Sequence, residues 1–245
     1  MVQSIILSFY KELSKNPTNP GEIVHTEKFT YKNKTVTMHG LINSGDLRGI
    51  YINEEYKFLK VEGKTVVDIG TNIGDSAIYF ILNGAKNVIG LEPYPYSFNL
   101  AISNIRDNNM TGVIELLNAG YGHQSEIYVN ENQMDTTGLA LRPSNTGKLI
   151  KTLSLKNIIE KYNLNNFVLK MDCEGYEYAL IDEEDQLFNN IQMIQIEYHY
   201  GYETLLTKLK KCGFNVKFTA PRKSYNPKAE NPHMESGYIY AERLQ

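Results

Sequence analysis

A glycine turn between an apolar strand and a helix restricts the fold of this chain more than any other feature. Residues 66–69, Val-Val-Asp-Ile, have the composition of a buried strand, and a turn with glycines at both ends, residues 70–74, follows before a helical pattern begins. Glycine adopts the positive φ angles of such turns without steric cost. The segment therefore predicts a strand, turn and helix that hold a nucleotide at the carboxyl end of a parallel strand.

After Gly63, apolar strands alternate with amphipathic helices. This pattern is typical of a parallel sheet with helices on both faces, so the expected fold class is α/β. The expected strands are 65–69, 87–91, 113–117, 167–171 and 193–197, and the expected helices are 75–82, 97–106, 154–162, 176–181 and 203–211. Two last strands, 214–218 and 237–241, have no helix between them. They predict an antiparallel hairpin at the edge of a seven-stranded sheet.

The first 62 residues have a different pattern. Apolar residues at helical spacing predict a helix over 3–14, and β-branched and aromatic residues predict a β-hairpin over 22–42. We expect residues 1–62 to form a cap on the domain of residues 63–245. A polar stretch at 120–151 is too long for an ordinary connection, so it predicts a functional loop or a hairpin.

Composition and charge narrow the function. Among 245 residues, 25 Lys and Arg nearly balance 28 Asp and Glu, so nucleic acid is not the expected partner. The two cysteines, Cys173 and Cys212, form no metal or disulfide motif, which favours a reducing cytoplasm. The N-terminus lacks the features of a signal peptide, and no apolar run reaches the roughly 20 residues of a transmembrane helix. We expect a cytoplasmic protein with no membrane partner; the sequence makes no prediction of its oligomeric state.

Position 72 decides which nucleotide the turn favours. A dinucleotide fingerprint needs a second glycine there, where this chain has Asn72, so a pyrophosphate is disfavoured. We expect Asp68, at the end of the first strand, to point into the crevice and suit an ammonium group, while Glu92, at the end of the second, suits a ribose diol. S-adenosylmethionine carries both groups. The alternative is a plain tight turn in which both acids cap helices.

Three further motifs carry a resemblance to a known family. They are L-E-P-Y-P at 91–95, K-M-D-C-E-G-Y-E at 170–177 and I-Q-I-E-Y-H at 194–199. Together with the glycine turn, they closely resemble the FkbM family of S-adenosylmethionine-dependent methyltransferases, over about residues 64–244. The resemblance implies the class I methyltransferase (Rossmann-like) fold, a mostly parallel sheet with an antiparallel last strand, and methylation of a hydroxyl oxygen. We expect the acceptor to be a small molecule, a sugar or a glycan.

The carboxyl ends of parallel strands meet at one edge of the sheet, so residues that follow the strands are the site candidates. Asp172 is placed to take the acceptor proton, although a helix cap is its alternative role. Glu174, two residues further on, is also a catalytic candidate. His199, whose imidazole titrates near neutral pH, is the other candidate base or else a plain buried or surface histidine. The expected cofactor contacts are Asp68, Gly70, Thr71, Asn72, Gly74, Glu92, Pro93, Asn118, Ala119 and Asp172, with a plain turn as the alternative role of Asn118 and Ala119. Tyr94, Tyr96, Tyr198, Tyr200 and Tyr202 are candidates for an aromatic wall around the acceptor, and core packing is the alternative role for some of them.

Two other functions stay open. The residues Asp172, Glu174, Glu197 and His199 are hard ligands at adjacent strand ends, so a divalent metal could help to deprotonate a diol or catechol, although no resident metal is our first expectation. The second alternative function is an RNA-binding methyltransferase or a catalytically silent binding module. It is suggested by basic residues near the C-terminus, namely Lys208, Lys210, Lys211, Lys217, Arg222 and Lys223. A solvated face is the simpler interpretation of these residues.

Overall fold

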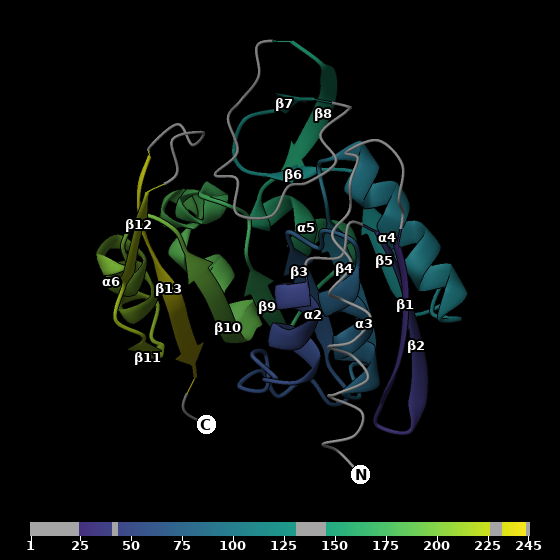
Figure 1. Ribbon diagram of the computed structural model, residues 1–245. Helices are drawn as coiled ribbons and strands as arrows, with labels where there is room; N and C mark the ends of the chain where they lie inside the picture. Colours follow the sequence, from purple (N-terminus) through teal and green to yellow (C-terminus); the bar gives the residue numbers. More distant parts are fainter. Residues whose placement is uncertain (1–24, 41–43, 131–145, 226–231, 244–245) are drawn as a thin grey trace.

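The structure is a computed structural model that describes residues 25–40, 44–130, 146–225 and 232–243. Its centre is a sheet in the order β11-β13-β10-β9-β3-β4-β5 (Figure 1). The strands are β3 (Thr65–Ile69), β4 (Asn87–Leu91), β5 (Ile114–Leu117), β9 (Phe167–Met171), β10 (Ile191–Tyr198), β11 (Asn215–Phe218) and β13 (His233–Glu242). β13 is antiparallel to β10 and β11, and the other neighbouring pairs are parallel. The expected α/β sheet with an antiparallel last strand is confirmed.

The antiparallel pair expected at the edge of the sheet is present. β11 is the outermost strand and pairs antiparallel with β13, which lies between β11 and β10. A further strand, β12 (Arg222–Tyr225), pairs with the first part of β13 beyond the sheet. β12 was not predicted from the sequence, because all four of its residues are exposed and carry no burial pattern.

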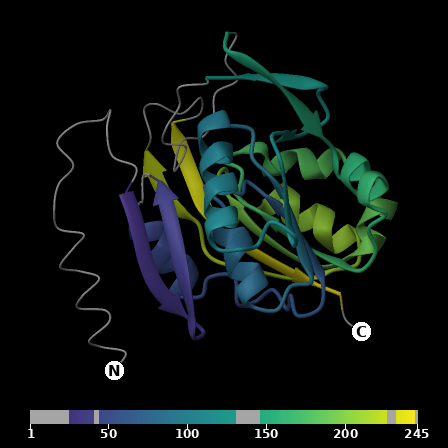
Figure 2. The same ribbon diagram turned by 90° about the vertical axis from the view of Figure 1, so that its right-hand side faces the viewer.

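Helices cover both faces of the sheet and give the molecule three layers (Figure 2). The helices of one face are α2 (Ser44–Tyr51), α3 (Asp75–Leu82) and α4 (Pro95–Asp107); those of the other are α5 (Leu155–Tyr162), the 3-10 helices η1 (Tyr176–Asp182) and η2 (Asp185–Asn190), and α6 (Glu203–Lys211). Alternate residues of the strands enter two separate cores. Val66 packs with Ile78 and Phe80 on the first face, whereas Val67 packs with Ile158 and Leu205 on the second.

The hairpin predicted near the N-terminus is present as β1 (His25–Tyr31) and β2 (Lys34–Gly40). Its two turn residues, Lys32 and Asn33, both have positive φ, as a two-residue type I′ turn requires. Val36 and Met38 are buried in the core that α3 and α4 share, so the hairpin packs on the helical layer. The helix expected over 3–14 lies outside the described residues, and the division of the chain at residue 62 stays a prediction.

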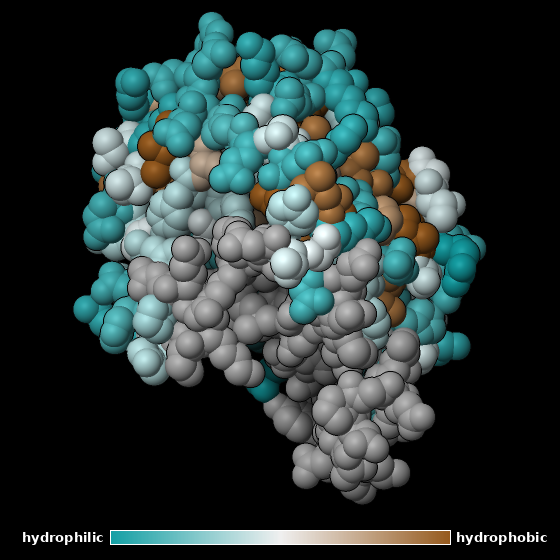
Figure 3. All heavy atoms as spheres, turned by 90° about the horizontal axis from the view of Figure 1, so that it is seen from above, coloured by the Kyte–Doolittle hydropathy of each residue, from teal (hydrophilic) through white to brown (hydrophobic). Residues whose placement is uncertain are grey.

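The polar stretch after β5 forms a small separate sheet of β6 (Gly120–Tyr121), β7 (Glu126–Val129) and β8 (Lys148–Leu153). β7 and β8 are antiparallel, as the hairpin alternative predicted. This sheet lies at the top of Figure 1, above the carboxyl ends of the parallel strands. Figure 3 looks down onto the same end, where hydrophobic residues form a band among mostly hydrophilic ones.

Candidate functional site

A cavity of about 560 Å³ opens at the carboxyl edge of the sheet. The residues that line it include the segment after α2, the glycine turn, the ends of the parallel strands, parts of β6 and β7, and the β12–β13 ribbon. Its size falls in the range of pockets that enclose small ligands. Of the expected cofactor contacts, six line it, namely Gly70, Asn72, Glu92, Pro93, Ala119 and Asp172.

The glycine turn touches the end of β9. Gly70 has a φ of 79°, and a Cβ atom on it would lie 1.8 Å from the backbone oxygen of Asp172. Any side chain at position 70 would therefore separate the two segments. Gly74, with a φ of 85°, precedes α3 and packs on Ala101, so it shapes the turn without lining the cavity.

Asp68 does not point into the crevice, and this expectation is wrong. Its side chain is fully buried, with Oδ1 3.0 Å from Nζ of Lys170 and Oδ2 accepting a 2.6 Å hydrogen bond from the Ser76 hydroxyl. A buried carboxylate needs such partners because water no longer solvates it. Thr71 is buried as well, and its hydroxyl donates to the Asp68 backbone oxygen. A cofactor contact by either side chain stays a prediction.

Lys170 is a cavity residue that the sequence analysis missed. Its side chain is only 2% exposed, and its ammonium group donates to the backbone oxygen of Gly70 at 2.7 Å. Burial by itself would lower its pKa, but the neighbouring Asp68 and Asp172 carboxylates raise the pKa above its usual value. A signal was available, because a lysine inside the apolar strand 167–171 must find a buried partner.

Glu92 lies at the cavity wall in the position expected for a ribose contact. Its two oxygens accept hydrogen bonds from the backbone N–H groups of Asn72 and Tyr94, each at 2.9 Å. Burial raises the pKa of Glu92 to about 7, although both N–H groups lower it. Asn118 supports this turn, since its amide donates to the backbone oxygens of Glu92 and Pro93.

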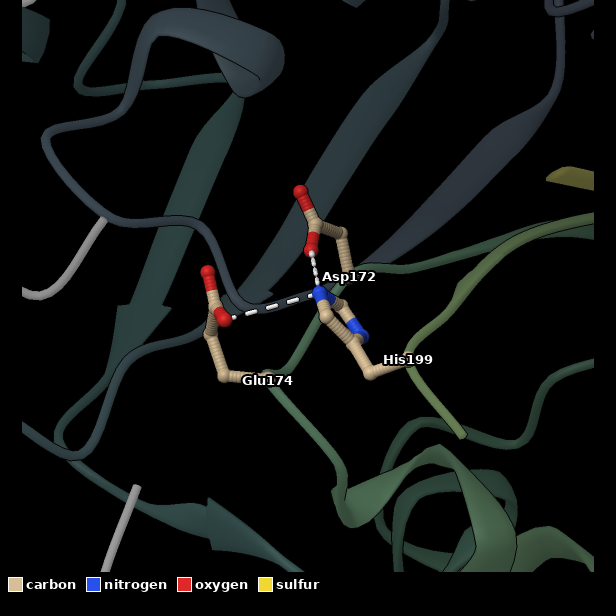
Figure 4. A group of neighbouring side chains, drawn as sticks. All are labelled: Asp172, Glu174 and His199. Carbon is tan, nitrogen blue, oxygen red and sulfur yellow. Dashed lines mark ion pairs between the residues drawn. The ribbon is translucent and has the colours of Figure 1, made fainter. Parts of the chain in front are cut away.

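Three candidate catalytic side chains converge at the ends of β9 and β10 (Figure 4). Nε2 of His199 lies 3.4 Å from Oε2 of Glu174 and 4.0 Å from Oδ1 of Asp172. The structure therefore brings together all three of the residues that the sequence analysis named as catalytic. Their ligand atoms lie within 4.8 Å of one another, a spacing that a single cation could bridge. Glu197, the fourth candidate ligand, is not part of this group.

Glu177, the last residue of the motif at 170–177, contacts the other side of the His199 ring, a role that was not predicted from the sequence. The fully buried Glu177 carboxylate lies 2.9 Å from Nδ1 of His199 and also accepts its backbone N–H. Burial by itself would lower the pKa of His199, but Glu177, followed by the other two acids, raises it to about 10. His199 is thus an imidazolium at neutral pH, which corrects the expectation that it titrates near neutrality.

The aromatic residues of the cavity differ from those expected. Tyr94 lines it, whereas Tyr198 is fully buried and donates to the backbone oxygen of Thr219. Tyr96, Tyr200 and Tyr202 do not line it either. The tyrosines that do line it, besides Tyr94, are Tyr56, Tyr121, Tyr128, Tyr176, Tyr225 and Tyr238.

Comparison with known proteins decides the family. A model described as the methyltransferase FkbM domain matches residues 68–216, which include the glycine turn, Asp172 and His199. The chain belongs to the FkbM methyltransferase family. As a member of this family it has the class I methyltransferase fold and uses S-adenosylmethionine as its methyl donor.

Other matches have low sequence identity or cover a short stretch of the chain. Among solved structures, the FkbM chain is 15% identical to M. jannaschii TYW2 in complex with AdoMet, with a TM-score of 0.48 and coverage of 91% of this chain and 89% of that one. P. horikoshii TYW2 in complex with MeSAdo is 14% identical, with a TM-score of 0.48 and coverage of 91% and 73%. An uncharacterized protein 158B of Sulfolobus islandicus rod-shaped virus 1 is 51% identical over 37 residues, which are 15% of this chain and 23% of that protein.

The basic residues considered for RNA binding are partly paired with acids. Lys208 and Lys211 both contact Asp185, and Lys223 contacts Glu235 at 3.0 Å. None of the helices in the described ranges is long and apolar enough to cross a membrane.

Proposed function

We propose that this FkbM protein methylates a hydroxyl oxygen of a small molecule, a sugar or a glycan. The observation that carries the proposal is the contact between the glycine turn and the end of β9, which places the expected cofactor edge and Asp172 on one cavity. A base at a strand end beside the methyl donor is what O-methylation requires. RNA, with its phosphates, is the less favoured acceptor because the cavity presents several carboxylates.

The residues of the cavity fit S-adenosylmethionine. Gly70 leaves space where any side chain would clash, and Glu92 presents a buried carboxylate for the two ribose hydroxyls. Ala119 and Pro93 form an apolar wall beside Glu92, suited to the adenine ring. When bound, the cofactor supplies a methyl group on a positively charged sulfur, and the new bond from the acceptor oxygen to this carbon forms as the bond from carbon to sulfur breaks.

Asp172 is the residue that we assign to the acceptor proton. It lines the cavity, with 28% of its side chain exposed, so it is accessible to an acceptor hydroxyl. His199 cannot accept this proton while both of its ring nitrogens face carboxylates and the ring is charged. We assign to His199, together with Glu174, the role of orienting the Asp172 carboxylate.

The cofactor assignment is tested by calorimetry with S-adenosylmethionine and with NAD. Glu92→Ala should weaken the binding of S-adenosylmethionine, because two ribose hydrogen bonds are lost. Unchanged affinity of the variant, or tighter binding of NAD, would show that the assignment is wrong.

The proton acceptor is tested by single-turnover rates at saturating cofactor. The acceptor is found by screening sugars and small hydroxylated molecules with labelled methyl donor. Asp172→Asn should remove most of the methyl transfer and keep cofactor affinity, whereas His199→Ala should reduce the rate less. A larger defect in His199→Ala would move the base to His199.

A metal-assisted reaction on a diol or catechol is the second candidate, favoured by the short distances within the group of Asp172, Glu174 and His199. These residues fit a hard divalent cation, provided that His199 loses its proton on binding. Activity that a chelator removes and magnesium restores would support this candidate over the first.

We place the reaction in the cytoplasm. The two cysteines are both free in the structure, as a reducing compartment favours. A disulfide-linked form in freshly isolated protein, detected by thiol titration, would contradict this location.

A further inference from the structure

One part of the cavity lining is rich in carboxylates and tyrosines. Glu55 and Tyr56 come from the segment after α2, and Glu197 and Tyr238 come from β10 and β13. Glu197 and Tyr238 are direct neighbours in the register of the two strands. In the sheet, β9 separates β10, which carries Glu197, from the cofactor edge at β3 and β4, so the acceptor is the ligand expected beside Glu197.

The position of Glu55 is fixed by groups that contact its backbone and side chain. Its N–H donates to the backbone oxygen of Gly49, and the Gln195 amide donates to its backbone oxygen at 3.0 Å. A Cβ atom on Gly49 would lie 2.6 Å from Oε2 of Glu55. The glycine within α2 therefore leaves space for the carboxylate, although glycine weakens a helix.

The cavity holds more negative charge than its own cations offset. Within the described part of the chain, no Lys, Arg or His lies within ion-pair distance of Glu55, Asp75 or Glu197, all of which line the cavity. The two cations that line it, Lys170 and His199, already contact the carboxylates of other acids.

This excess charge is costly without a ligand. Carboxylates that line one cavity repel one another, so Glu55, Glu197 and Asp172 raise the electrostatic energy of the empty site. A neutral acceptor would displace the water that solvates these carboxylates without making equally favourable interactions with them. A phosphate would be repelled by their negative charge. A cation would be stabilised by them.

The tyrosine rings of the cavity favour the same kind of ligand. Tyr56 already has Nζ of Lys170 5.7 Å from its ring centroid, and Tyr238 and the 64% exposed Tyr225 of β12 also line the cavity. Aromatic faces attract ammonium groups through their quadrupoles. The carboxylates and the aromatic rings therefore both favour a positively charged ligand.

We propose that the methyl acceptor carries an ammonium group, held between Glu55 and Glu197, in addition to the hydroxyl that is methylated at Asp172. The acceptor class is thus a hydroxylated amine, such as an amino sugar or an aromatic amino alcohol. This inference rests on the proposed methyltransferase function and names the substrate class of the same cavity.

The test uses the full chain loaded with S-adenosylhomocysteine, in a buffer free of Tris and phosphate. Two sets of probes are titrated and followed by ligand-observed NMR: glucosamine, glucose and glucose 6-phosphate in one, and tyramine and 4-ethylphenol in the other. In at least one set, the amine should bind about tenfold or more tightly than its neutral partner, as a charge-assisted hydrogen bond provides. Glucose 6-phosphate should bind more weakly than glucose.

Variants connect this preference to the two carboxylates. Glu55→Gln and Glu197→Gln should each reduce the preference for the amine by about tenfold and leave the affinity for the neutral probe unchanged. Glu160→Gln, on the exposed face of α5, changes the net charge equally and should have no effect.

Three results would overturn the inference: no preference for the amine in either set, a preference that survives both substitutions, or an equal loss of S-adenosylmethionine affinity in both variants. The last would assign the carboxylates to the cofactor. Failure of the wild-type chain to bind any cofactor would instead refute the proposed function, so the two failures are distinguishable.

Discussion

Replacing Lys170 with methionine should destabilise the fold strongly, because it leaves a buried carboxylate without its cation. Nζ of Lys170 lies 3.0 Å from Oδ1 of Asp68, and the two side chains are 2% and 0% exposed. Removing one partner of a buried ion pair costs about 3–5 kcal/mol. This range includes the loss of the hydrogen bond from Lys170 to the Gly70 backbone oxygen, which is worth about 1 kcal/mol. We therefore expect Lys170→Met to lower the free energy of unfolding by about 4 kcal/mol.

The assay is urea unfolding, followed by far-UV circular dichroism and by the fluorescence of the 18 tyrosines. Coincident transitions justify a two-state free energy. The control, Lys156→Met, breaks a pair of 3.5 Å whose side chains are 51% and 54% exposed, so it should cost no more than about 1 kcal/mol. A loss below about 1 kcal/mol for Lys170→Met would refute the reasoning.

The pH dependence provides a second test of the same pair. Burial already raises the pKa of Asp68 although Lys170 lowers it, and removal of the lysine should raise it further. When the pKa of a carboxyl is higher in the folded protein than in the unfolded chain, the folded state holds the proton more tightly. The free energy of unfolding therefore falls as pH rises from the unfolded pKa to the folded one. The deficit of Lys170→Met should therefore be larger at pH 8 than at pH 5, and an equal deficit at both would exclude an unpaired Asp68 as its cause.

Two more predictions concern the cofactor edge and the hairpin. Because the pKa of Glu92 is about 7, its carboxylate becomes protonated as pH decreases through 7, and the affinity for S-adenosylhomocysteine should fall. In calorimetry, Glu92→Gln should remove this pH dependence. A pH dependence that persists in the variant would assign it to another group. Asn104→Ala should destabilise the protein by about 2–4 kcal/mol in urea, since this buried amide bonds both backbone groups of His39 and the oxygen of Ile73. Asn99→Ala, exposed on the same helix, should change the stability by less than about 0.5 kcal/mol, and equal losses would contradict the role of Asn104.

Local patterns predicted most of the central fold. The strands at 65–69, 87–91 and 167–171 match to the residue, because short runs of buried apolar side chains end at glycine or at charged residues. Helix α2 was missed, since its eight residues include two glycines and few apolar positions. The place of β13 inside the sheet could not be predicted, because pairing between distant strands leaves no local pattern.

The site was predicted where its residues follow strands. Asp172, Glu174 and His199 were expected together from the topology alone, and the structure brings them together. The predicted direction of the Asp68 side chain was wrong, because this side chain pairs with Lys170 from another strand. Glu55 could not be identified, since it comes from a segment with no motif and reaches the cavity through its packing on Gly49.

The close packing of Gly70 on the backbone of Asp172 limits how this scaffold can change its acceptor. Two segments distant in the sequence occupy adjoining volume, so neither can retreat to admit a larger molecule. Additional room can arise where the lining belongs to segments outside the central sheet, such as Tyr225 and Met234 of the β12–β13 ribbon and Tyr128 of β7. Divergence of acceptor size among descendants of this chain should therefore accumulate in these segments, while the contact between Gly70 and Asp172 keeps its dimensions.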